Sequence, residues 1–135
     1  MADDIKKVER YSIDVANEPG EGARVLQALA DAKINLLACW GYPAETGARI
    51  ELIPEDGEAL RSAARAAKLK IKKESLAFCV TGRNKAGALA GVLAKLAEQK
   101  INVHAVQAIA IGGKYAALVQ VDAKAARKAA VALGV

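Results

Sequence analysis

Residues 11–35, YSIDVANEPGEGARVLQALADAKIN, and residues 78–102, FCVTGRNKAGALAGVLAKLAEQKIN, decide the fold, because the second stretch repeats the first. Apolar, glycine and asparagine positions recur in the same order. The matched pairs are Tyr11/Phe78, Ile13/Val80, Asn17/Asn84, Gly20/Gly87, Val25/Val92, Leu26/Leu93, Leu29/Leu96, Lys33/Lys100, Ile34/Ile101 and Asn35/Asn102. So long a self-match predicts two copies of one structural unit. The predicted domains are residues 1–74 and residues 75–135.

Each copy begins with a predicted strand and helix. Residues 11–15 and 76–81 alternate apolar and polar side chains, as half-buried strands do. After each strand and a short polar loop, apolar residues recur at the spacing of one face of a helix. In the second copy these residues are Leu89, Val92, Leu93 and Leu96. Both copies therefore start with a strand, a polar loop and an amphipathic helix.

The rest of each copy completes an α+β unit. Apolar runs predict strands over 34–42 and 48–53 in the first copy and over 101–111 and 114–121 in the second. Gly112 and Gly113 suit a tight hairpin between the last two. An alanine-rich helix follows in each copy, and residues 69–74 read as a fourth strand. The predicted fold is two ferredoxin-like β-α-β-β-α-β repeats with antiparallel sheets.

The second copy lacks the last strand of this unit, because Val135 follows directly on its second helix. In this topology the last strand covers the edge of the first strand, so residues 76–81 would be left with an open apolar edge. Open edges of this kind invite pairing between chains. We therefore expect residues 76–81 to pair with a strand of another chain, in a homodimer.

Composition excludes several classes of protein. The chain is 53% hydrophobic and 26% charged, which is typical of a folded globular domain. No segment reaches the roughly 18 uncharged apolar residues of a membrane span, and the charged start is unlike a signal peptide, so we expect a cytoplasmic protein. Cys39 and Cys79 form no CxxC pair and are expected to be buried free thiols.

The net charge of +5 comes from the second half of the chain, where basic residues are spread along elements rather than clustered. The chain also lacks the aromatic-rich strand motif with which RRM domains stack RNA bases. Nucleic-acid binding is therefore disfavoured as a function.

Residues suited to catalysis are scarce. His104 is the only histidine, and it lies in a predicted strand without local partners at metal-ligand spacing. The common phosphate-binding, dinucleotide-binding and hydrolase motifs are absent from the sequence. We predict no catalytic residue, no metal and no cofactor, and we expect His104 in the core or at an interface.

The loops before the first helix of each copy are the candidate binding sites. A helix N-terminus offers unpaired N–H groups and the positive end of a dipole, which suit a carboxylate. Gly20 and Gly87 would let a ligand approach the backbone, with amides supplied by Asn17, Asn35, Asn84 and Asn102. Alternatively, these asparagines only form turns or helix caps.

The same residues resemble the ACT domain, a small ligand-binding module of amino-acid metabolism. The N-x-P-G and G-I-N-I signatures of that family are matched by Asn17-Glu-Pro-Gly20 and Lys33-Ile-Asn-Leu36 and, less closely, by Asn84-Lys-Ala-Gly-Ala-Leu89 and Lys100-Ile-Asn-Val103. The resemblance implies that a free amino acid binds at interfaces between modules. The implied ligand-binding residues are Asn17, Glu18, Pro19, Gly20, Asn35, Asn84, Gly87, Ala88 and Asn102.

Two departures from the family pattern separate the copies: Ala86 replaces the proline of the second loop, and Gly22 replaces a leucine in the first helix. Trp40 and Tyr42 would either wall a pocket or pack as strand residues. Together these observations predict a non-catalytic, amino-acid-binding regulatory protein that acts on a metabolic enzyme or transporter. The alternatives are an interaction subunit with inactive ligand sites and, less favoured, a nucleic-acid-binding module.

Overall fold

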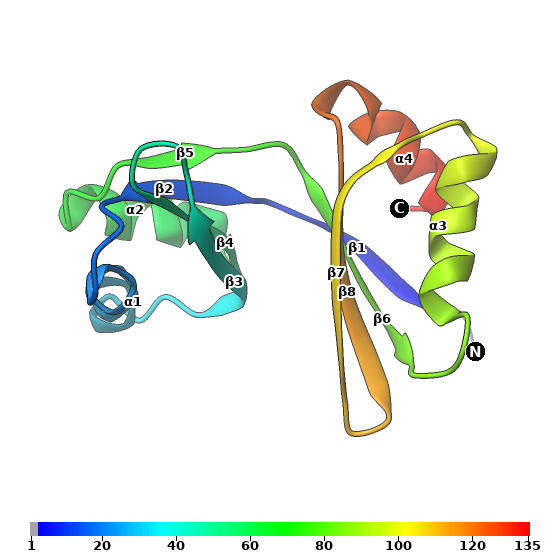
Figure 1. The fold of residues 1–135 in the computed structure, drawn as a ribbon, viewed down its shortest axis with the longest axis horizontal. Helices are drawn as coiled ribbons and strands as arrows, with labels where there is room; N and C mark the ends of the chain where they lie inside the picture. Colours follow the sequence, from blue (N-terminus) through cyan, green and yellow to red (C-terminus); the bar gives the residue numbers. More distant parts are fainter. Residues whose placement is uncertain (1–2) are drawn as a thin grey trace. The chain divides into compact units, whose positions relative to one another are not determined.

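The repeat forms two four-stranded antiparallel sheets, each with its own helices and apolar core (Figure 1). The computed structural model describes residues 3–135. We call Glu9–Glu74 the inner unit, and we call Ser75–Val135 together with strand β1 (Asp4–Val8) the split unit. This architecture confirms the predicted pair of ferredoxin-like repeats.

The inner unit has the complete predicted set of elements. In chain order these are β2 (Tyr11–Val15), α1 (Glu21–Asp31), β3 (Leu36–Pro43), β4 (Ala48–Pro54), α2 (Gly57–Ala66) and β5 (Ile71–Lys73). The sheet order is β3-β4-β2-β5, so the short β5 is an edge strand, as predicted. Its core consists of Tyr11, Ile13, Val25, Leu29, Ile50, Leu52 and Leu60. Strand residues two apart point to one face, and the two helices bury that face.

The split unit repeats this arrangement with one exception. Its elements are β6 (Ala77–Arg83), α3 (Ala88–Glu98), β7 (Val103–Ile111), β8 (Lys114–Val121), the 3₁₀ turn Ala123–Ala125 and α4 (Ala126–Leu133). The sheet order is β1-β6-β8-β7. Strand β1 therefore takes the place that β5 has in the inner unit.

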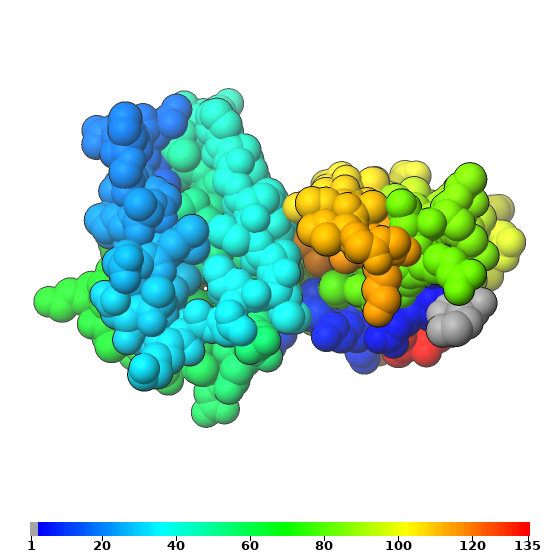
Figure 2. All heavy atoms as spheres, turned by 90° about the horizontal axis from the view of Figure 1, so that it is seen from below, coloured from blue at the N-terminus to red at the C-terminus, as the bar shows by residue number. Residues whose placement is uncertain are grey.

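Strand β1 corrects the prediction that residues 76–81 pair with another chain. It runs antiparallel to β6, from Asp4 opposite Thr81 to Val8 opposite Ala77, and Ile5 packs against the core. This pairing satisfies the backbone groups along the edge of β6 within one chain. The division into residues 1–74 and 75–135 accordingly differs from the structure at the N-terminal end, where β1 belongs with Ser75–Val135. In Figure 2 the blue N-terminal segment lies beside the red C-terminal residues.

Two turns depend on glycine. Gly112 and Gly113 both have positive φ, 61° and 80°, which is the geometry of the predicted tight hairpin between β7 and β8. In the β3–β4 connection Gly47 has φ 88°, and a Cβ there would lie 2.5 Å from the carbonyl oxygen of Val15. These positions fix the register of both hairpins.

The expected burial of the two cysteines was wrong. Cys39 is exposed and Cys79 is only half-buried, because β3 is an edge strand and Cys79 faces away from the core residues Phe78 and Val80. His104 is exposed on the edge strand β7, which excludes the core but agrees with the other expected place, an interface. No helix in residues 3–135 is long and apolar enough to cross a membrane.

Candidate functional site

The loop before α3 is held by backbone hydrogen bonds and leaves the helix N-terminus open. The N–H of Asn84 donates to the carbonyl of Gly113, at 3.0 Å, which ties the loop to the β7–β8 hairpin. Gly87 is the N-cap, with φ 83°, and no side chain in the described chain caps the helix there. The first turn carries no acidic residue. The dipole at this helix end is therefore not offset by a protein carboxylate in that turn.

A cavity of about 330 Å³ adjoins this helix end. It brings together three of the predicted ligand-binding residues, Asn84, Gly87 and Ala88, with Lys85 beside them. The remaining wall is mostly apolar and consists of Leu89, Ala90, Ala108, Ile109, Ala110 and Tyr115. The volume lies within the usual range for small-molecule sites, roughly 300–1,000 Å³.

Tyr115 gives this cavity a polar group that sequence reasoning missed. Its side chain is buried beside Asp3. Burial, the charge of Asp3 and a hydrogen bond to that carboxylate raise the pKa of the phenol, which stays protonated at neutral pH. The phenol therefore brings a hydrogen-bonding group, next to a carboxylate, to the wall of this cavity.

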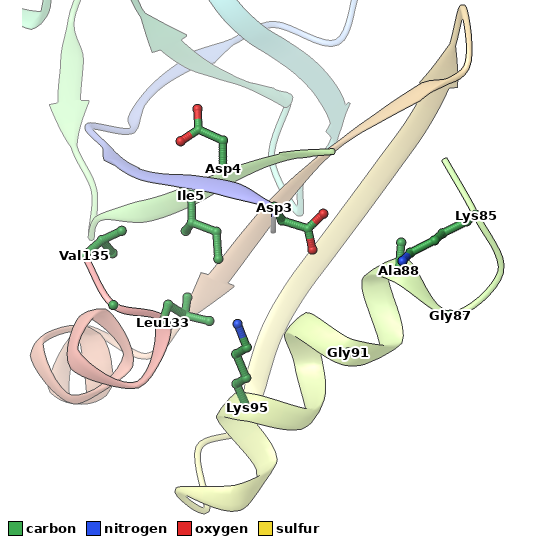
Figure 3. A pocket seen from close by; sticks show the side chains of 11 residues that line it. Asp3, Asp4, Ile5, Lys85, Gly87, Ala88, Gly91, Lys95, Leu133 and Val135 are labelled. Carbon is green, nitrogen blue, oxygen red and sulfur yellow. The ribbon is translucent and has the colours of Figure 1, made fainter. Parts of the chain in front are cut away.

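A second cavity, of about 570 Å³, lies on the other side of the same turn, between β1, α3 and the end of α4 (Figure 3). Lys85, Gly87 and Ala88 line both cavities. The side chains of Asp3 and Lys95 extend into the space between β1 and α3, whereas that of Asp4 points away from it (Figure 3). The first turn of α3 is thus open on two sides.

The corresponding loop of the inner unit has different electrostatics. Asn17, Glu18, Pro19 and Gly20 are all exposed, and Gly20 is again an N-cap with positive φ. The first turn of α1 contains Glu21, the counterpart of Ala88, and Arg24 donates to its carboxylate at 2.8 and 3.2 Å. The Arg24 hydrogen bond holds the pKa of Glu21 below its usual value, so the carboxylate is charged. A ligand carboxylate would meet this charge at α1 but not at α3.

Asn35 and Asn102 do not lie with the loops that were expected to share a site with them. Each follows the C-terminal end of its helix, whereas the loop asparagines precede the N-terminal end. An 11-residue helix is about 16 Å long, which separates the two groups. Neither Asn35 nor Asn102 lines either cavity at α3.

Trp40 and Tyr42 lie on β3 and are not among the residues that line the two cavities at α3. The Tyr42 hydroxyl donates to the buried carboxylate of Glu51, which also accepts a charge-assisted bond from Arg10. This arrangement fits the expectation that these aromatic residues pack on the strand. No cluster of three or more His, Cys, Asp or Glu in residues 3–135 could hold a metal ion.

Comparison with known proteins shows similarity in structure rather than in sequence. No family model matches the chain, and no curated protein sequence matches it. A solved structure of a Bacteroides thetaiotaomicron protein superposes with a TM-score of 0.82 at 19% identity, over 96% of this chain and 88% of that one. The regulatory subunit of aspartate kinase from Thermus thermophilus superposes with a TM-score of 0.64 at 16% identity, over 99% of this chain and 95% of that one.

A third similar structure, of aspartokinase alpha and beta subunits, gives a TM-score of 0.62 at 19% identity and covers 98% of this chain and 95% of that one. Because all three identities are low, the likeness concerns the fold. The chain has the tandem ferredoxin-like, ACT-type fold that is also found in regulatory subunits of aspartate kinase.

Proposed function

We propose that the chain is a non-catalytic regulatory module that binds the α-carboxylate of a free amino acid at the N-terminus of α3. The observation that carries the proposal is a helix end without side-chain cap or acid that opens on a cavity of about 330 Å³. Similarity in fold to regulatory subunits of aspartate kinase supports a regulatory role toward an enzyme of amino-acid metabolism. The site in the split unit is favoured over the loop of the inner unit because Glu21 occupies the helix end there.

Each group around the cavity has a distinct part in this proposal. The N–H groups of the first turn and the Lys85 ammonium attract the carboxylate. The side-chain amide oxygen of Asn84 accepts from the ligand ammonium, and the Tyr115 hydroxyl is the second polar group. Ala108 and Ala110 leave space for a small apolar ligand side chain.

The proposal includes a homodimer formed through β7, because this cavity opens beside an unprotected strand. β7 is nine residues long, lies at the sheet edge and contains no Asp, Glu, Lys or Arg. Ile109 is 63% exposed and Ile111 is 74% exposed. Long apolar edge strands pair with another chain unless they are protected. A second copy of β7 would cover Ile109, which lines the cavity, and would complete the site.

The ligand prediction is tested by thermal denaturation with each of the twenty amino acids at millimolar concentration. A ligand specific for the folded state stabilises it by about 2.7 kcal/mol at a hundredfold excess over Kd. Ala88→Glu places in α3 the carboxylate that α1 already has. We expect it to abolish the ligand-induced shift while stabilising the free protein by about 0.3–1 kcal/mol, because an acid at a helix N-terminus is favourable.

The matched control is Glu21→Ala, the reverse exchange in the inner unit, which should not reduce the shift. Asn84 lines only the smaller cavity and Lys95 only the larger one, so Asn84→Ala should weaken binding more than Lys95→Ala. The proposal fails if no amino acid shifts the melting temperature, or if Ala88→Glu leaves a shift intact. If none of the twenty amino acids shifts the melting temperature, the alternative of an interaction subunit with inactive ligand sites is favoured.

The dimer is tested by light scattering. We expect the parent protein to have twice the chain mass of 14.1 kDa and Ile111→Lys to have the chain mass, because a lysine on an edge strand opposes pairing with another chain. The control is Val131→Lys on α4, where the side chain is 76% exposed. A monomeric parent, or equal dissociation by both variants, would exclude the β7 interface.

A further inference from the structure

A groove between the second helix and the outermost strand recurs in both units. In the inner unit it lies between α2 and β5 and has a volume of about 420 Å³. In the split unit it lies between α4 and β1 and has a volume of about 570 Å³. The proposed amino-acid site involves neither groove.

Basic side chains line both grooves. The inner-unit groove contains Arg61, Arg65, Lys70 and Lys73. The split-unit groove contains Lys7, Lys124 and Arg127, and no acidic residue lines either groove. Tyr11, whose hydroxyl accepts a hydrogen bond from Arg61, also lines the first groove. The remaining surface is apolar, from Ala64, Leu69 and Ile71 in the first groove and from Leu76, Ala123, Ala126 and Ala130 in the second.

The same pair of cations occupies equivalent places in the two units. Lys73 lies opposite Tyr11 in the sheet and Lys7 lies opposite Phe78, and Tyr11 and Phe78 are matched positions of the repeat. Each lysine is two residues from an isoleucine that packs on its core, Ile71 or Ile5, so it faces the helices. Arg61 and Arg127 line the helix sides, each three residues before an alanine that also lines the groove.

The internal repeat extends to both cations, because Ile5-Lys6-Lys7 matches Ile71-Lys72-Lys73 at an offset of 66 residues and Arg61 matches Arg127 at the same offset. β5 follows α2 directly in the chain, whereas β1 precedes every other element of the split unit. Protection of sheet edges accounts for lysines on both faces of β1 and β5. It does not account for the arginines of the helices. Both copies of the repeat keep this arginine and lysine beside an apolar surface, and this conserved combination points to a shared ligand.

The local charge balance favours an anion with more than one negative charge. Glu9 is the acidic partner in the inner unit, with its Oε2 3.0 Å from Lys73 Nζ and its Oε1 3.7 Å from Arg61 Nη1. The structure shows no ion pair for Arg65 or Lys70, nor for Lys7, Lys124 or Arg127, within residues 3–135. Guanidinium groups bind phosphate oxygens in a bidentate fashion, and lysines add point charges.

We propose that each of these grooves binds the phosphate groups of a small phosphorylated molecule, with a nucleoside polyphosphate as the chemical class. Both volumes lie within the range for small-molecule sites, roughly 300–1,000 Å³. The cations of each groove bind the phosphates. The apolar surface, with Leu69 and Ile71 in the inner unit, contacts the remainder of the molecule.

Titration calorimetry with ATP and with inorganic tripolyphosphate, without divalent cations, tests this proposal. Lys70→Glu in the inner unit and Arg127→Glu in the split unit should each weaken binding at their own groove by about tenfold or more, because a charge-assisted contact is replaced by repulsion. The matched controls are Lys72→Glu and Lys6→Glu. These residues lie on the same two strands, and neither lines a groove.

The expected result is that ATP binds more tightly than tripolyphosphate and that the controls change affinity by less than about threefold, as exposed charges do. Equal losses in the controls would mean diffuse surface attraction and would overturn the proposal. So would the absence of binding at millimolar ATP. Binding of a single-stranded oligonucleotide without binding of ATP would also overturn it, in favour of nucleic acid.

Discussion

Deletion of residues 1–8 is expected to unfold the split unit and leave the inner unit folded. The deletion removes β1, exposes the edge of β6 and takes away Ile5 from a core that includes Phe78 and Val80. The inner unit, Glu9–Glu74, has its own core and should keep a cooperative transition. Trp40, the only tryptophan, lies in β3, so its fluorescence reports on the inner unit while far-UV circular dichroism reports on both.

We expect the Trp40 transition to persist after the deletion while the ellipticity of the folded protein falls by about half, in proportion to the residues of the unfolded unit. A synthetic peptide of residues 1–9 should restore part of the lost signal, because strand pairing does not require a covalent link. Unchanged ellipticity and a single parental transition would show that β1 is dispensable. A folded dimer of the deleted protein would instead support pairing of β6 between chains.

Phe78→Ala is expected to destabilise the split unit by about 3–5 kcal/mol, since truncation of a buried phenylalanine loses transfer free energy and leaves a cavity. Phe78 is fully buried on β6, between β1 and β8, and it is the only phenylalanine in the chain. Domains are usually stable by only about 5–15 kcal/mol, so this loss is a large part of the total. Urea denaturation followed by circular dichroism measures it.

Val131→Ala is the matched control, because Val131 belongs to the same unit and its side chain is 76% exposed. Its expected effect is within about 0.5 kcal/mol. The Trp40 fluorescence transition should be the same in both variants. A loss below about 1 kcal/mol for Phe78→Ala would contradict the burial of this side chain.

Local patterns in the sequence predicted most of the fold, because each copy carries its own periodicity and turn residues. Gly112 and Gly113 predicted the hairpin between β7 and β8. The residues shared by 11–35 and 78–102 predicted the repeat. β1 escaped detection because Asp4–Val8 has the sequence DIKKV, with little apolar alternation. Its partner, β6, lies 69–77 positions away. The available signal, the match of Ile5-Lys6-Lys7 with Ile71-Lys72-Lys73 of β5, lies outside the two stretches that reveal the repeat.

The candidate site was predictable only in part. Asn84, Gly87 and Ala88 adjoin one cavity because they are neighbours in sequence at one helix end. Asn102 was grouped with them because it offers an amide next to the helix in sequence, although helix α3 separates it from the loop. Tyr115 could have been placed from the hairpin register, which sets it opposite Ala110. The place of Asp3 could not be predicted from the sequence in this way, because it depends on the pairing of β1, which directly follows Asp3 in the chain.

The pairing of β1 with β6 has a consequence for synthesis of the chain. Residues 4–8 leave the ribosome before any part of their partner strand exists, and the whole inner unit is made in the interval. The inner unit has all its strands once residue 73 has emerged, whereas the split unit must wait for β6 and the elements after it. During that delay β1 is a strand without a sheet. Lys6 and Lys7 keep this waiting segment hydrated, so its weak apolar pattern, which hid it from sequence reasoning, protects the nascent chain from aggregation.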